Sequence, residues 1–246
     1  MKFILYSVFF GLIALSVFAC KEDDKEGTLT LHFKAVYDGQ PLQTFTTYSF
    51  NSPEQIQFTH LSMYVSDLTL YSGTTEKNLH DIALIDLSFN SAGAADSGYT
   101  LVLENVPASS YDGILFGIGV PPDENAKKPA DFPSSSPLSL TGYYWLGWNS
   151  YIFMKTEGRL DTIGNGDFSI GYALHSGSNQ LYRTMDGPVP LVIEDGKNTD
   201  LTILFNYKEI LEGVDIKSNP QNHTPQDTSL IMKIVNNLPS SIHLIP

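Results

Sequence analysis

The sequence predicts an all-β protein, an antiparallel β-sandwich of the Greek-key or immunoglobulin-like type that carries a short C-terminal helix. Three observations predict this fold class. Apolar and polar residues alternate with a period of two in several segments, turn-forming residues separate these segments, and long helical stretches are few. Many short strands without βαβ units are typical of a sandwich.

The clearest predicted strand covers residues 28–37 and is followed by the turn Asp38-Gly39. Its odd-numbered residues, from Leu29 to Tyr37, are apolar, and its even-numbered residues from Thr28 to Lys34 are polar. A second long run, 55–71, changes parity at His60-Leu61, which indicates a bulge or a bend between sheets. Further strands are expected at 82–89, 99–103, 113–120, 151–158, 168–175, 189–194 and 201–207.

Two segments depart from the strand pattern. Residues 121–137 form a loop dense in proline, aspartate and serine, and long loops inside a domain are commonly functional. Residues 225–237 predict the helix, because Thr224 can cap it and Pro225 suits its first turn. An apolar stripe follows, and Pro239 comes after the predicted end. The stripe consists of Leu230, Ile231, Ile234 and Leu238.

The N-terminus predicts a lipoprotein signal peptide over residues 1–19. Lys2 precedes an apolar stretch that is short for a membrane span, and small Ala19 stands before Cys20. Cys20 is the only cysteine, so we expect it to carry a lipid, and no intramolecular disulfide can form. Residues 20–27 are then a lipidated acidic tether, and 28–246 the sandwich domain.

The charged run 21–25 resembles the export signal of Bacteroidetes lipoproteins. We therefore expect an outer-membrane protein held by its lipid, on either the inner or the outer face. The formal net charge of −13 argues against nucleic acid as a partner, because phosphates would repel the chain. No nucleophile elbow, phosphate loop, zinc-protease helix or dinucleotide fingerprint is present, so we expect no enzyme activity.

Several stretches, in order along the chain, together resemble the MbnP-like proteins. These are copper-associated β-sandwich proteins, secreted or lipid-anchored, of methanotrophs and Bacteroidetes. The stretches are 31–33 with 39–42, 58–70, 116–121 with Asn125, 144–148 with 151–153 and 157–158, His175-Ser176-Gly177, and His223 with 236–237.

The resemblance implies a copper site. In the best-known members, a partner di-haem enzyme of the peroxidase type oxidises a tryptophan to kynurenine, which then helps histidines to bind copper. Here Trp148 or Trp145 would be the modified residue, and His175 and His223 the histidines. Two family features are missing: Ala35 stands where members often have histidine, and Ser150 where a glycine is expected before the tyrosine.

The residues also leave alternatives open. The small residues Ser169, Gly171 and Ala173 share the parity of His175 and would leave room around its imidazole, although a turn role would suit His175 equally. The aromatic cluster Trp145, Trp148, Tyr144 and Tyr151 could pack in the core, or bind a glycan or another ligand for an uptake system. Asp123, Glu124 and Asn125 could hold calcium or form a solvated loop. After copper handling and ligand binding, a purely structural lipoprotein is the third possible function.

Overall fold

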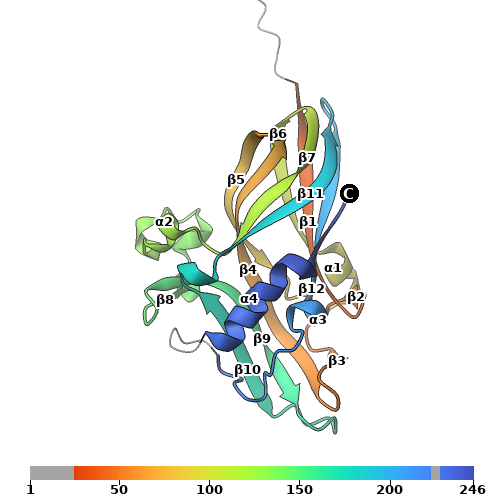
Figure 1. The fold of residues 1–246 in the computed structure, drawn as a ribbon, viewed down its shortest axis with the longest axis vertical. Coiled ribbons are helices and arrows are strands. Elements are labelled where there is room, and N and C mark those ends of the chain that lie inside the picture. The colour runs from red at the N-terminus through yellow and green to blue at the C-terminus, as the bar shows by residue number, and fades with distance from the viewer. Residues whose placement is uncertain (1–24, 223–227) are drawn as a thin grey trace, which may run out of the picture.

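The computed structural model describes residues 25–222 and 228–246 (Figure 1). Its strands form two sheets, and the predicted β-sandwich is confirmed. The first sheet has the order β13-β12-β1-β2, with β6 also paired to β1. Its strands are β13 (Ile242–Ile245), β12 (Asn198–Asn206), β1 (Glu26–Tyr37), β2 (Gln40–Pro41) and β6 (Tyr99–Pro107).

The second sheet has the order β10-β9-β4-β7-β11, and β3, β5 and β8 pair with its members. Its strands are β10 (Ile170–Gly177), β9 (Ser150–Asp161), β4 (Gln55–Ser72), β7 (Ser109–Ile118), β11 (Arg183–Ile193), β3 (Thr47–Ser49), β5 (Thr75–Asp86) and β8 (Tyr144–Trp145). Long β4 forms the centre of this sheet, because it pairs with β9 along its first half and with β5 and β7 along its second.

The main core lies between the two sheets. The apolar parity of β1 is buried as predicted, and Leu29, Leu31 and Phe33 are fully inside. Of the two alternatives for β4, a bulge is present, but it lies just before the predicted position: the register with β9 shifts between Phe58 and His60. One pairing departs from the antiparallel pattern: β1 runs parallel to β12.

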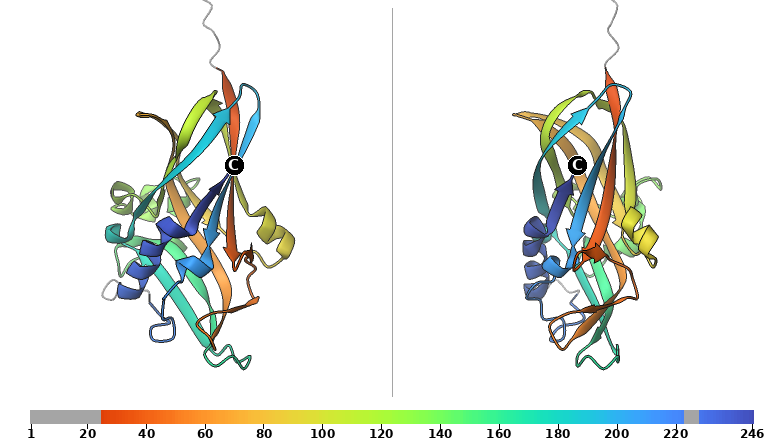
Figure 2. Two further views of the ribbon diagram at one scale, coloured as in Figure 1. Left: turned by 45° about the vertical axis from the view of Figure 1, so that its right-hand side comes forward. Right: turned by 90° about the vertical axis from the view of Figure 1, so that its right-hand side faces the viewer.

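Four α-helices lie outside the sheets within the described residues: α1 (Ala92–Ser97), α2 (Pro122–Asn125), α3 (Tyr207–Ile210) and α4 (Ser229–Ser241). In the right-hand view of Figure 2, α1 and α4 lie on opposite sides of the molecule. Helix α4 buries Ile231, Ile234 and Leu238 in the main core, as the apolar stripe predicted.

The predicted boundaries of the C-terminal helix were partly wrong. Its predicted start, Thr224 and Pro225, lies outside the described residues. In the described part the helix begins after Thr228 and continues through Pro239 to Ser241. Pro239 lies in the last turns, where the lack of one N–H interrupts few helical hydrogen bonds. None of the helices among the described residues is both long and apolar enough to cross a membrane.

Candidate functional site

The outer face of the second sheet carries a second apolar layer. On β9, Met154 and Leu160 point into the main core, whereas Tyr151 and Phe153 belong to a separate buried cluster with Tyr64. The segment 121–149, which contains α2 and β8, covers this cluster and projects to the left in Figure 1. Residues of β9 that follow with the same parity as Phe153, namely Lys155 and Glu157, therefore lie beside this segment.

His175 and Glu157 form the central polar contact of this face. The imidazole Nε2 lies 2.8 Å from Glu157 Oε1, and the whole residue His175 is only 8% exposed. The hydrogen bond from His175 lowers the pKa of Glu157, and the nearby charges of His175, His60 and Lys155 lower it further, against the effect of desolvation. An ionised carboxylate accepts a hydrogen bond, so His175 Nε2 carries a proton, and in the neutral form of the ring the lone pair is then on Nδ1.

The two tryptophans stack beside His175. Their ring centres are 5.7 Å apart with an angle of 19° between the planes, and Trp145 also meets His175 edge-on at 6.3 Å. Trp148 packs against the backbone of Gly177, where a Cβ atom would come within 2.2 Å of the indole. Gly177, two residues after His175, therefore leaves the space that the Trp148 ring occupies.

A buried amide anchors the hairpin that carries these tryptophans. Asn125 Oδ1 accepts hydrogen bonds from Ser150 Oγ at 3.0 Å and from the backbone N–H of Tyr151 at 2.8 Å. Its Nδ2 donates to Asn179 Oδ1 at 2.8 Å. The end of α2 thus fixes the start of β9, and with it the position of the tryptophans.

This arrangement bears on the calcium alternative at Asp123, Glu124 and Asn125, because it already uses one of the three side chains. Asn125 is 5% exposed, and its oxygen already accepts two hydrogen bonds. Asp123 is exposed on α2, whereas Glu124 is half-buried. In residues 25–222 and 228–246, no group of three or more His, Cys, Asp or Glu side chains comes together to hold a metal ion.

The predicted aromatic platform also needs correction. Tyr151 is fully buried, and its hydroxyl donates to the carbonyl of Leu138 at 2.7 Å, so it cannot contact a ligand at the surface. Tyr144 packs on Tyr151 and donates to Asn149 Oδ1. The other three predicted residues, Tyr144, Trp145 and Trp148, are half-buried.

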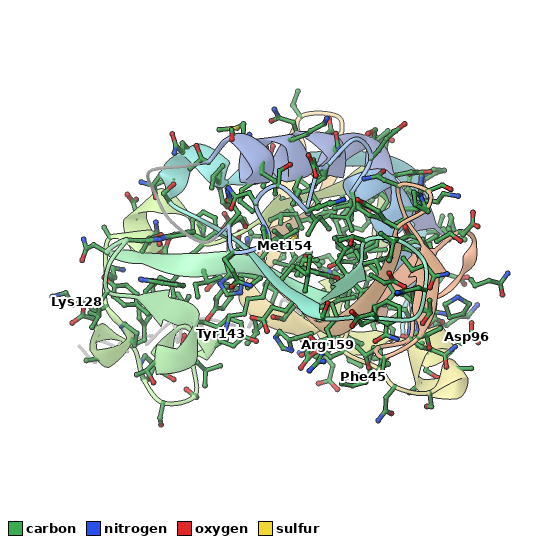
Figure 3. The ribbon with its side chains drawn as sticks, turned by 90° about the horizontal axis from the view of Figure 1, so that it is seen from below. Phe45, Asp96, Lys128, Tyr143, Met154 and Arg159 are labelled. Carbon is green, nitrogen blue, oxygen red and sulfur yellow. The ribbon has the colours of Figure 1, made fainter. Side chains whose placement is uncertain are left out.

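Sequence reasoning missed the polar residues that flank this site. Tyr143 donates to Ser62 Oγ at 3.0 Å, and Ser62 in turn lies 2.9 Å from His60 Nε2. Lys155 Nζ lies 4.0 Å from the centre of the Tyr143 ring and donates to a nearby carbonyl. In Figure 3, Tyr143 lies on the same side of the molecule as Lys128, away from Phe45. The alternation of β9 was the signal that could have found Lys155 and Glu157.

Two predicted residues, Cys20 and His223, lie outside the described residues. The described chain does approach the site just before His223, because the carbonyl of Asn222 accepts a hydrogen bond from the backbone N–H of His175 at 3.1 Å. The donor types present also suit copper, which favours imidazole nitrogen. His175 has a carboxylate behind its ring and an indole at its edge.

Comparison with known proteins gave two matches. A family model described as MbnP matches residues 26–227. Among solved structures, the chain is similar to MbnP from Methylosinus trichosporium, with a TM-score of 0.60 and 15% sequence identity, over 89% of this chain and 98% of that one. A search of curated proteins found no match. The structural match, at this identity, supports the fold alone.

Proposed function

Because the chain belongs to the MbnP family, we propose that it is a non-enzymatic copper-binding protein of the cell envelope. The observation that carries this proposal is the position of His175, which contacts Glu157 on one side and Trp145 on the other. These three residues come from β10, β9 and β8, which are neighbours in the second sheet.

Glu157 would prepare His175 for a metal. Metal-binding histidines commonly donate their second ring N–H to a carboxylate, which fixes the tautomer and makes the ligand more basic. The Nε2–Oε1 contact of 2.8 Å supports this arrangement, in which Nδ1 would face the metal. Copper bound there would supply a redox-active cation that prefers nitrogen donors.

Trp145 is the better candidate for the oxidised residue. Its ring contacts His175, whereas Trp148 packs on Gly177 and on Trp145. Opening an indole to kynurenine leaves a carbonyl oxygen and an aromatic amine, which are both possible donors. A di-haem partner of the peroxidase type would perform this oxidation, as in the family's best-known members. His223, which directly follows Asn222, would supply the second imidazole.

The test compares histidine variants in copper titrations of protein purified from its native host. His175→Ala should abolish tight binding, because it removes the central ligand. His32→Ala is a matched control, since His32 also contacts a carboxylate at 2.9 Å but lies on the other sheet. Native mass spectrometry should find the kynurenine mass on Trp145. Unmodified tryptophan together with no copper uptake would disprove the proposal.

The membrane anchor is proposed on sequence grounds. Cys20 would carry the lipid and hold the protein on the outer membrane. Cells fed labelled palmitate should label the wild-type protein, whereas Cys20→Ser should stay unlabelled and remain unprocessed. Equal labelling of both proteins would place the lipid elsewhere.

A second candidate function rests on the exposure of the tryptophan hairpin. Leu146, at its tip, is 83% exposed, and Trp145 and Trp148 are half-buried beside it. Aromatic rings of this kind stack against the apolar faces of sugars. A glycan array probed with the wild-type protein and with Trp148→Ala would test this function, and a wild-type protein without hits would exclude it for the glycans on the array.

A further inference from the structure

A groove lies between the segment 121–138 and the neighbouring strands β4 and β5, and its volume is about 440 Å³. Its floor is apolar and includes Ile82, Phe132 and Leu138. Leu138 is buried and packs inside the protein, whereas Phe132 is half-exposed and accessible to a ligand. This groove is separate from the contact of His175 with Glu157, because none of those residues lines it.

Two side-chain hydrogen bonds hold residues 137–138, at one wall of the groove, in place in the unbound protein. Tyr64 donates from its hydroxyl to the carbonyl of Pro137 at 3.0 Å, and Tyr151 donates to the carbonyl of Leu138 at 2.7 Å. Both tyrosines are fully buried. A groove that needs no rearrangement loses little entropy on binding, so its shape is suited to recognition.

The rim of the groove is acidic. Asp67, Asp81 and Glu124 line it, and none of its lining residues is basic. Tyr182 donates to Asp67 Oδ2 at 3.2 Å, which holds that carboxylate in place. These carboxylates are not gathered as metal ligands, since the described part of the chain holds no such group of three. Their charge is spread around an apolar floor, which suits a cation on an apolar stem better than a bare metal ion.

The ring of Phe132 already accepts a cation. Lys127 Nζ lies 5.6 Å from its centre, within the range of a cation–π contact. Lys127 does not line the groove, and an ammonium or guanidinium group entering the groove would reach the same ring and gain the carboxylates as well.

We propose that this groove binds a basic, apolar segment of a partner protein, in which a lysine or arginine side chain lies on Phe132 and its neighbours pack on Ile82. The acidic rim and the net charge of −13 would attract such a segment over a distance. A segment of protein fits better than a free amine, because an amino group alone would leave the apolar lining residues, such as Ile82 and Phe132, uncovered. The proposal does not depend on copper binding.

The test uses an acetylated and amidated peptide that alternates arginine and leucine, titrated into the protein by calorimetry. Wild type should bind it, and added salt should weaken the binding. Replacing two rim carboxylates (Asp81→Asn with Glu124→Gln) should weaken it about tenfold or more. Asp123→Asn is the matched control: it removes one charge next to Glu124 outside the groove and should change affinity less than about twofold.

Several results would overturn the proposal. These are no binding of the peptide to wild type, equal weakening by Asp123→Asn and the double variant, or binding of n-butylammonium as tight as that of the peptide. NMR chemical-shift changes that occur on titration only at residues distant from Ile82 and Ser136 would also overturn it. Circular dichroism checks that the double variant folds.

Discussion

Replacing Glu157 by glutamine tests the core of the copper proposal, because it keeps the shape of the side chain and removes its charge. Loss of a carboxylate behind a metal-binding histidine commonly lowers metal affinity between about ten- and one-hundredfold, or about 1.4–2.8 kcal/mol. The Glu157 side chain is 34% exposed, so water screens its charge. We therefore expect a loss near the lower end, about tenfold.

The assay is competition for copper against a chelator, with thermal unfolding measured in parallel. The pH profile separates positioning from simple structural support. The pKa of Glu157 is lowered by His175, so the carboxylate is ionised above that lowered pKa. As the pH falls through it, wild type loses the charge that the variant never had, and the two affinities should converge.

Asp200→Asn is the matched control, since it removes the carboxylate 2.9 Å from His32 on the other sheet. It should leave copper affinity unchanged. The reasoning fails if Glu157→Gln binds copper as tightly as wild type while His175→Ala does not bind, or if the two affinities stay equally far apart at every pH.

Three further predictions concern the scaffold. Gly177→Ala should destabilise the fold by about 1–3 kcal/mol and change tryptophan fluorescence, because the new methyl group meets Trp148; Gly171→Ala, with open space around it on the same strand, should have little effect on either. Asn125→Ala should cost about 1–3 kcal/mol in chemical denaturation and speed proteolysis within 141–149, because two donors lose their acceptor; unchanged proteolysis would contradict the anchoring role. Burial raises the pKa of Asp161, but hydrogen bonds from the backbone of its own loop outweigh burial, so that the pKa is lowered overall. The stability of the wild-type protein should therefore fall as the pH drops through that lowered pKa. Asp161→Asn should lack this dependence in melting curves, and parallel curves for both proteins would contradict it.

The sequence predicted the strands whose alternation is strong and missed those that depend on neighbours. The start of β5 was missed because residues 75–81 are polar apart from Leu79, as suits a strand at the edge of a sheet. The first half of β11 was missed because Gly187 and Pro188 interrupt it. Four-residue β13 and the parallel pairing of β1 with β12 are fixed by contacts distant in sequence, which periodicity does not contain.

The candidate site was also predicted only in part from the sequence. Small neighbours on the parity of His175 suggested room for its imidazole, and Trp145 does lie at that ring. Glu157 could not be paired with His175 from sequence, because their contact runs diagonally between β9 and β10 and requires the register. Tyr151 and Asn125 were assigned to ligand binding by residue type alone, whereas both are used inside the fold.

The parallel pairing of β1 and β12 has a mechanical consequence. β1 starts at the first described residues, lies along the long axis of the molecule (Figure 1), and is held between β12 and β6. A pull on the N-terminus that is resisted at the far end would load these hydrogen bonds in shear, so they would have to break together rather than unzip one by one. The strand closest to the proposed tether is thus well placed to bear drag on the domain without being peeled from it.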